Sequence, residues 1–421
     1  MTPSRYLRHA RDARHPQSLR TRARRRLALS LRSPLASGLV AGVAGLALGA
    51  AAGPAQAQSS VTLYGTIDTA IVYANNAGGK RQFEMNSSNV LGNRWGLRGS
   101  EDLGNGLRAV FDLENGYSST TGGFQQGGDL FGRQAWVGLA SQRAGTLTAG
   151  RQYDAVVDFI GPFIAGTQWA TYLGGHPGDL DNTNNDYRSN NSVKYTTPTY
   201  RGLRASGLYS FGGTPGQFGR NSIWSLGVGY TGGPIVLGAA YVHVKDPNFS
   251  YFGNNSSSSA TGSNMAASRV YSGYASAGDE QIVAVGGTYT AGPAIIGAVY
   301  TNTRFGELGA HASLDPLGYR GSASFHNAEL NLRYYLTPVW LLGAAYDYTR
   351  GYGVNHVTYQ QGDLGITYIL SKRTQLYLVG LYQHASGTDS SGQAAVANIN
   401  GLSASSTPNQ VSVLAGITHR F

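Results

Sequence analysis

Residues 61–73 carry the sequence VTLYGTIDTAIVY. Apolar side chains such as Leu63, Ile67 and Ile71 occupy odd positions, whereas the even positions are more polar and include Asp68. A period of two residues is typical of a β-strand whose two faces meet different surroundings. The stretch therefore predicts a strand with one apolar and one polar face.

The same alternation returns further along the chain, most clearly in residues 327–336, NAELNLRYYL. Asn327, Glu329 and Asn331 alternate with alanine and leucine, and three such polar side chains would be costly in a dry core. Alternation alone leaves open which face turns inward, because a soluble barrel would bury the apolar one. Strand length favours a membrane, since a tilted strand needs about ten residues to cross the hydrocarbon layer.

Seven short turns connect such runs. Each turn holds the glycine, proline, asparagine or serine that a tight reversal requires. Between successive turns lie two strands and one longer polar segment, so seven turns and eight long loops predict sixteen strands. An even number of strands with short turns on one side and long loops on the other is typical of an outer-membrane barrel. The seven turns are Asp102–Asn105, Gln142–Gly145, Pro198–Gly202, Thr231–Pro234, Thr290–Pro293, Thr337–Pro338 and Ser371–Arg373.

Two of the connecting segments are long, residues 152–186 and residues 246–278. Structureless loops of this size would count against a compact soluble domain, but they are expected on the external face of a barrel. No change of composition marks a second domain. We therefore predict one all-β domain over residues 58–421, a sixteen-stranded antiparallel transmembrane β-barrel with short periplasmic turns and long external loops.

The N-terminal segment, residues 1–57, has a different composition. Ten arginines and one acidic residue lie there, so nine of the ten net positive charges of the chain belong to this segment. An apolar stretch at 35–52 and the sequence Pro54-Ala55-Gln56-Ala57 follow, which predicts a secretory signal cleaved after Ala57. A single membrane anchor is the alternative. The remaining chain is nearly neutral, so no nucleic-acid partner is predicted.

The residue types needed for metal or thiol chemistry are scarce. The chain has no cysteine, which excludes a disulfide framework and a thiolate metal site. Its nine histidines are scattered without metal-ligand spacing. We predict no cofactor, no metal and no catalytic site.

Four stretches resemble one known family, the Gram-negative general porins. They are SSVTLYGTIDTAIVYAN at 59–75, NRWGLRGSEDLGNGLRAVFDLENGY at 93–117, FGRQAWVGLASQRAGTLTAGRQYD at 131–154 and GITHRF at 416–421. The resemblance implies a homotrimer in the bacterial outer membrane, in contact with lipid and lipopolysaccharide, that passes small hydrophilic solutes and ions by passive diffusion. It also implies a third loop folded into the barrel, and a final Phe421 that the outer-membrane insertion machinery recognises.

A third loop inside the barrel would narrow the pore between an acidic and a basic side. Opposed charges across a narrow aqueous passage create a transverse field, and clusters of one sign set ion preference. The loop offers as its acidic side Asp154, Asp158, Asp179, Asp181 and Asp186. The basic wall combines arginines in segments similar to the family's arginine-bearing strands with cations of the same strand parity: Arg94, Arg133, Arg188, Arg98, Arg108 and Lys194. For each cation the alternative is a solvated strand residue or a structural ion pair.

The predicted function is a passive channel with a slight preference for anions. The nearest alternative is a substrate-specific outer-membrane channel, which saturable block by one class of solute would reveal. A β-barrel adhesin would bind ligands without conducting ions, an outer-membrane enzyme would need a polar catalytic cluster, and a soluble exported β-protein would not need detergent.

Overall fold

The computed structural model describes residues 59–253 and 263–421. The predicted signal segment, residues 1–57, and the serine-rich run at 254–259 lie outside the described residues.

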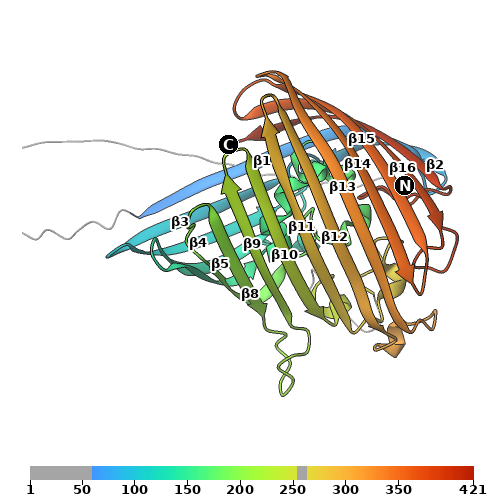
Figure 1. The fold of residues 1–421 in the computed structure, drawn as a ribbon, viewed down its shortest axis with the longest axis horizontal. Helices are drawn as coiled ribbons and strands as arrows, with labels where there is room; N and C mark the ends of the chain where they lie inside the picture. The colour runs from blue at the N-terminus through green and yellow to red at the C-terminus, as the bar shows by residue number, and fades with distance from the viewer. Residues whose placement is uncertain (1–58, 254–262) are drawn as a thin grey trace, which may run out of the picture. The chain divides into compact units, whose positions relative to one another are not determined.

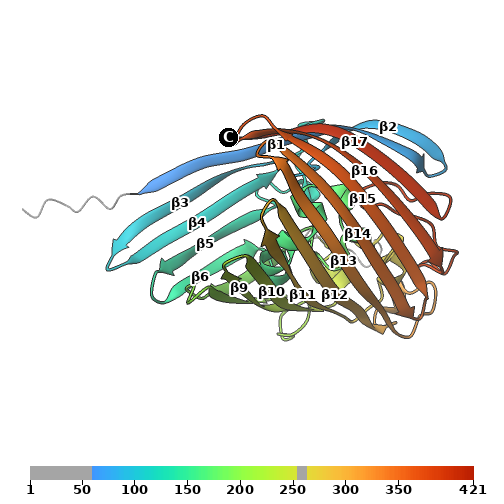
Figure 2. The ribbon, with the colours of Figure 1, turned by 45° about the horizontal axis from the view of Figure 1, so that its top comes forward.

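The described strands form one closed antiparallel sheet. From β3 onward each strand pairs with the next one in the chain, and β1 (Ser60–Ala77) pairs with the last strand, β17 (Asn409–Arg420), from Thr66–Arg420 to Ala74–Ser412. Figures 1 and 2 show the strands following one another around the ring. Pairing of the first strand with the last closes the ring, as a lipid environment requires of a sheet.

Seventeen strand segments occupy sixteen positions in this ring. The first half of β1 pairs with β3 (Arg94–Gly104), and its second half pairs with β2 (Lys80–Ser87) on the same side. β2 and β3 are thus two parts of one barrel strand, interrupted at residues 88–93. The prediction of a sixteen-stranded barrel is confirmed.

The remaining elements follow in chain order. The strands are β4 (Leu107–Gly116), β5 (Gln134–Ser141), β6 (Gly145–Gln152), β7 (Ser189–Thr196), β8 (Leu203–Ser210), β9 (Ile223–Gly232), β10 (Ile235–Lys245), β11 (Asp279–Ala291), β12 (Ala294–Leu308), β13 (Gly321–Thr337), β14 (Trp340–Gly353), β15 (Val357–Ile369) and β16 (Thr374–Gly387). The α-helices are α1 (Ala155–Phe159), α2 (Ala165–Gln168) and α3 (Pro247–Ser250), and 3₁₀ turns occur at Gln126–Gly128, Gly161–Phe163, Tyr172–Gly174, Pro177–Asp179, Ser272–Tyr274 and Ala312–Leu314. Among the described residues, no helix is both long and apolar enough to cross a membrane.

The apolar face of the strands points outward. Asn327, Glu329 and Asn331 of β13 are buried inside the barrel, whereas Leu330 between them is 61% exposed on the outer surface. In β1, Asp68 is fully buried, while Leu63, Ile67 and Ile71 on the opposite face are exposed. This arrangement answers the question that alternation left open: lipid takes the place of a dry core.

All seven predicted turns join consecutive strands, but two of the eight connections at the other end are not long. Residues 78–79 link β1 to β2, and residues 354–356 link β14 to β15. Gly78 and Gly79 both have positive φ angles, 60° and 93°, which is the backbone of a two-residue hairpin turn. Here the strands themselves continue outward and a tight turn closes them, so a long loop is unnecessary.

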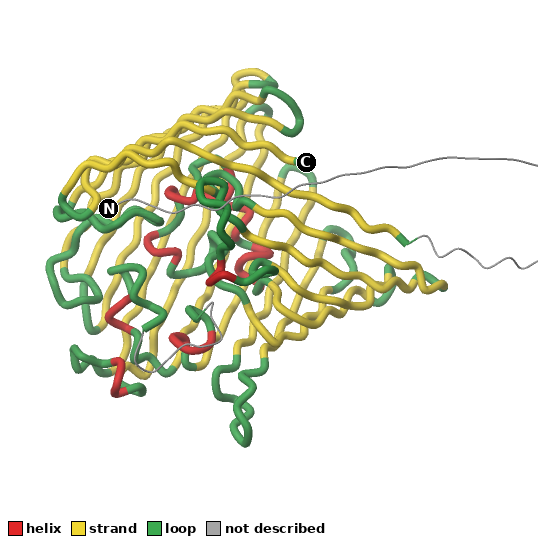
Figure 3. The backbone as a smooth tube through the Cα atoms, turned by 180° about the vertical axis from the view of Figure 1, so that it is seen from behind, coloured by secondary structure: helices red, strands yellow, loops and turns green. Residues whose placement is uncertain are grey.

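The third loop, residues 153–188, folds back against the inside of the barrel, as predicted. Figure 3 shows its short helices within the ring of strands. Phe159 of α1 lies over Gly227 and Gly229 of β9, where a Cβ atom would come within 2.4 Å and 2.8 Å of its ring. Trp169 lies in the same way over Gly343 of β14. Glycines in the wall therefore make room for the aromatic side chains that seat the loop.

Candidate pore constriction

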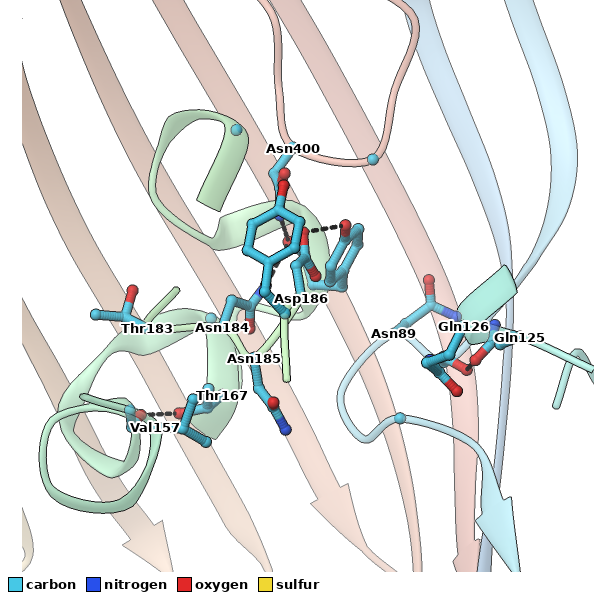
Figure 4. A pocket seen from close by; sticks show the side chains of 18 of the residues that line it. Asn89, Gln125, Gln126, Val157, Thr167, Thr183, Asn184, Asn185, Asp186 and Asn400 are labelled. Atoms are coloured by element: carbon cyan, nitrogen blue, oxygen red, sulfur yellow. Dashed lines mark hydrogen bonds between the residues drawn. The ribbon is translucent and has the colours of Figure 1, made fainter. Parts of the chain in front are cut away.

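The inner face of the third loop borders a cavity of about 1220 Å³. Residues 86–92, the second loop (residues 117–133, between β4 and β5) and parts of the loops that follow β10 and β16 contribute to its lining. Figure 4 shows Asn89 and Gln126 lying across the cavity from Asn185 and Asp186. Most lining side chains are polar amides and hydroxyls. Among the described residues, the charged side chains of the lining are Arg94, Arg133, Arg188, Arg333 and Asp186.

Arg133 is the most firmly held of these arginines. Its Nε donates to Glu114 Oε1 at 2.8 Å, and its Nη2 donates to the hydroxyl of Tyr153 at 3.1 Å. Burial alone would lower the pKa of Arg133, but the neighbouring Tyr153 and Glu114 raise it. The side chain is therefore a permanent cation at the cavity wall. Arg94 Nη1 lies 4.0 Å from the same Glu114 oxygen.

Arg188 ends the third loop and is 3% exposed. Its Nη1 donates to the backbone carbonyl of Asp186 at 2.7 Å, and its Nε has no hydrogen-bond partner within the described part of the chain. Burial, and then the nearby charge of Arg133, lower its pKa to about 10, so it stays cationic at neutral pH. Three predicted wall residues, Arg94, Arg133 and Arg188, thus meet at one cavity.

The other three predicted wall residues lie elsewhere. Lys194 Nζ donates to the carbonyl of Tyr153 at 3.0 Å and forms an ion pair with Asp158, so it anchors the base of the third loop. Arg98 pairs with Asp112 at 2.6 Å, and Arg108 is an exposed residue beside the short turn between β3 and β4. Parity gave these residues the correct face but not the correct depth. Arg98, for example, lies four residues further along β3 than Arg94, and four residues of a strand span about 13 Å.

Only one of the five predicted loop acids, Asp186, lines the cavity. Asp154 is fully buried and caps α1, where its Oδ1 accepts hydrogen bonds from the backbone N–H groups of Val156 and Val157. Its other oxygen accepts from Tyr251 at 2.6 Å and from Asn182 at 2.8 Å. The prediction that Asp154 is a pore charge is wrong, because the carboxylate satisfies donors inside the loop, and burial raises its pKa.

Asp179 and Asp181 are also buried and not part of the lining. Asp179 accepts from the backbone N–H groups of Asn184 and Asp186 at 2.8 Å and 3.0 Å. Asp181 Oδ2 lies 2.6 Å from His176 Nδ1 and accepts from Thr301 of β12, also at 2.6 Å. Both carboxylates hold the loop in shape, and Asp158 is occupied by Lys194, so the predicted acidic side reduces to Asp186.

Asp186 faces the cavity beside Arg188. The hydroxyl of Tyr172 donates to its Oδ2 at 2.9 Å. Burial raises the pKa of Asp186 to about 6, although the Tyr172 hydrogen bond and Arg188 act in the opposite direction. Asp186, the single acid among the described lining residues, is therefore partly neutralised in mildly acidic solution, while the arginines stay charged.

Comparison with known proteins supports this architecture. A family model described as Gram-negative porin matches residues 43–388. The chain belongs to the Gram-negative porin family. It is 32% identical over 391 residues to an outer membrane porin protein of Bordetella pertussis. The aligned region covers 83% of this chain and 93% of that protein. It is 37% identical over 181 residues to outer membrane porin protein 32 of Delftia acidovorans, which covers 39% of this chain and 48% of that protein.

Solved structures share the fold. An anion-selective porin from Comamonas acidovorans superposes with a TM-score of 0.67 at 23% identity, over 86% of this chain and all of that one. OmpT of Vibrio cholerae in its trimer form gives a TM-score of 0.60 at 16% identity, over 86% of this chain and 99% of that one. The porin is thus an outer-membrane channel for passive diffusion of small hydrophilic solutes and ions.

Two charged residues of the porin's wall were missed from the sequence. Glu114 accepts hydrogen bonds from Arg133, Tyr153 and Tyr64, and it stands between Arg94 and Arg133. Arg333 of β13 also lines the cavity. The signal that could have identified both is parity, because each side chain lies on the inward face of its strand. The sequence does not give the depth of these side chains in the barrel, and depth decides whether they reach the cavity.

Proposed function

We propose that this porin prefers anions, and that Arg94, Arg133, Arg188 and Arg333 set the preference. The observation that carries the proposal is the charge of the cavity lining, four arginines against Asp186 alone among the described residues. A narrow aqueous passage lined by one sign of charge raises the local concentration of counter-ions. Glu114 offsets part of the charge of Arg133, so Arg188 and Arg333 contribute the less compensated positive charge.

A relative supports the same direction. The solved porin from Comamonas acidovorans, described as anion-selective, has this fold. At 23% identity the likeness concerns the fold, and the proposed anion preference follows from the four arginines of this chain.

Planar-bilayer recording tests the proposal directly. The reversal potential of the purified porin under a KCl gradient should indicate chloride preference. Arg188→Gln and Arg333→Gln together should lower the chloride-to-potassium permeability ratio by about two-fold or more, because two charges leave the narrow passage. Arg108→Gln is the matched control, since it removes a lumenal-parity arginine outside the cavity. An unchanged ratio in the double variant, or an equal fall in the control, would refute the assignment.

Diffusion without strong substrate preference is the proposed mode of transport. A substrate-specific channel would show saturable block of the current by one class of solute, and an adhesin would insert without conducting. Titrating the chloride current with sulfate, acetate and a neutral sugar separates these alternatives. A flux that rises linearly with solute concentration would support a general porin. The proposed role of the protein is diffusion and not catalysis.

We further infer a homotrimer surrounded by lipid and lipopolysaccharide. A trimeric solved relative supports the assembly, and the apolar outer face supports contact with lipid. Phe421 remains the proposed signal for the insertion machinery, and residues 1–57 the proposed signal peptide. Native mass spectrometry of the detergent-extracted protein tests the assembly and, from the mass of the mature chain, cleavage after Ala57.

A further inference from the structure

The interruption between β2 and β3 places a second short segment inside the barrel. Thr66 of β1 is paired with Arg94, and Thr69 is paired with Ser87. Three steps along β1 are therefore matched by seven steps on the partner strand. The segment that holds this surplus of four residues, which we call the strand-two insert (residues 88–93), leaves the wall and turns toward the cavity, which residues 88–92 line.

Asp68 of β1 holds this insert. It is fully buried, and its carboxylate accepts hydrogen bonds from three consecutive backbone N–H groups and one side-chain amide of the insert and from two hydroxyls of the barrel wall. Six donors on one carboxylate make a stiff anchor. The donors are Asn89 N at 2.9 Å, Asn89 Nδ2 at 3.2 Å, Val90 N at 3.1 Å, Leu91 N at 3.4 Å, Tyr377 Oη at 2.8 Å and Thr418 Oγ1 at 2.5 Å.

The insert touches both other parts of the constriction. The backbone N–H of Tyr172 in the third loop donates to the carbonyl of Asn89 at 2.6 Å. On the arginine side, a Cβ atom at Gly92 would lie 2.8 Å from Arg133 Nη1. Figure 4 shows Asn89 across the cavity from Asn184 and Asp186 of the third loop. The insert therefore closes the gap between the third loop and the arginine wall.

We propose that the strand-two insert is a second narrowing element of the pore, and that Asp68 is the residue that positions it. The third loop narrows the passage from one side, and the insert narrows it from the opposite side while limiting the space for Arg133. This inference goes beyond the proposed anion preference, because it assigns the size limit of the pore to a feature that carries no charge of its own at the cavity.

A cysteine at the insert tests the first half of the proposal. The chain has no native cysteine, so Leu91→Cys provides a single thiol among the lining residues. We expect 2-sulfonatoethyl methanethiosulfonate to label it from the aqueous phase and to lower the single-channel conductance by about two-fold or more. Thr120→Cys, in the exposed second loop, should be labelled without a change in conductance. An unchanged current after labelling of the Leu91→Cys variant, or a thiol there that mass spectrometry finds unlabelled, would overturn the proposal.

Asp68→Asn tests the positioning role. An amide offers one accepting oxygen, so it cannot serve donors on both sides of the former carboxylate. In liposomes, we expect the ratio of the trisaccharide uptake rate to the monosaccharide uptake rate to be about two-fold higher for the variant than for the wild type. When Leu91→Cys is combined with Asp68→Asn, the conductance loss after labelling of the thiol should be smaller. Asp102→Asn, at the exposed turn, is the control.

The two proposals fail separately. If Asp68→Asn does not fold, the Leu91→Cys recording still decides whether the insert narrows the pore. Chloride preference is measured in the same recordings before labelling. A channel without that preference would refute the proposed function and leave this inference standing, whereas unchanged conductance after labelling would refute this inference alone.

Discussion

His176 Nδ1 lies 2.6 Å from Asp181 Oδ2, and both side chains are fully buried between the third loop and the barrel wall. The opposite ring nitrogen, Nε2, lies 3.1 Å from Glu329 Oε2 and 3.7 Å from Asp347 Oδ2. One imidazole is thus surrounded by three carboxylates from the loop and from β13 and β14. The histidine joins the constriction loop to the wall behind it.

His176→Phe should loosen the third loop. The substitution keeps an aromatic ring but leaves buried carboxylates without their cation, and breaking a buried pair in this way costs about 3–5 kcal/mol. We expect faster proteolysis within the third loop and more frequent closures in single-channel records. The exposed His356→Phe is the control. Equal protease resistance of the His176 variant and the wild type would contradict the assigned role.

The same cluster predicts a loss of loop stability at alkaline pH. Burial alone would lower the pKa of His176, but Asp181 and the other carboxylates raise it well above its ordinary value. A raised pKa in the folded state means that the stabilisation is complete below about pH 6.5 and is lost as the pH rises through the raised value. Protease resistance of the loop should therefore fall in alkaline solution. In His176→Gln this step should be absent.

Ion preference should change in mildly acidic solution. The pKa of Asp186 is about 6 because of its burial, so the only acid among the described lining residues becomes neutral as the pH falls through that value. We expect the chloride-to-potassium permeability ratio to increase between pH 7 and pH 5. Asp186→Asn should have the high ratio at both pH values. A wild-type ratio that is constant across this interval would show that Asp186 does not influence permeating ions.

The ion pair between Lys194 and Asp158 should steady the base of the third loop. Their side chains are 12% and 24% exposed, so solvent screens the pair only in part. Lys194→Gln should increase open-channel current noise, because the loop loses its tie to β7. The double variant Lys194→Glu with Asp158→Lys should restore quiet recordings. If the charge-swapped protein is as noisy as the single variant, the ion pair is not the cause.

Gly65 of β1 should be needed to seat the last residue of the chain. Its backbone N–H and C=O groups both bond with Phe421 at 3.1 Å, and a Cβ atom there would lie 2.2 Å from the Phe421 ring. Gly65→Ala should displace this ring and destabilise the barrel by about 1–3 kcal/mol, seen as a lower midpoint of heat-induced unfolding on gels. Gly380→Ala is the control, because a Cβ atom at Gly380 meets open space. Equal midpoints in both variants would contradict the prediction.

Much of the fold was predictable because its signals are local. Alternation in a stretch such as residues 61–73 and the turn residues between strands depend only on near neighbours in the chain. These signals predicted the number of strands, the seven short turns and the side of each strand that carries Asp68 or Glu329. The inward third loop followed from resemblance to porins. The predicted wall residues Arg94, Arg133 and Arg188 line one cavity with that loop, and their role in the pore remains a prediction.

The sequence by itself determined the strands and the polar and apolar face of each, because alternation depends only on near neighbours in the chain. The composition of the N-terminal segment also predicts that the barrel is exported. Only the tertiary structure decided the depth of each inward side chain, which separates Arg94 at the cavity from Arg98 below it. It also decided which carboxylates are already hydrogen-bonded and which face the cavity. Asp154 accepts from Tyr251, and Asp68 accepts from Tyr377 and from the strand-two insert. Asp68 and Tyr377 meet because the closed ring brings β1 close to the last strands of the chain, whereas Asp154 and Tyr251 meet because the third loop folds into the barrel.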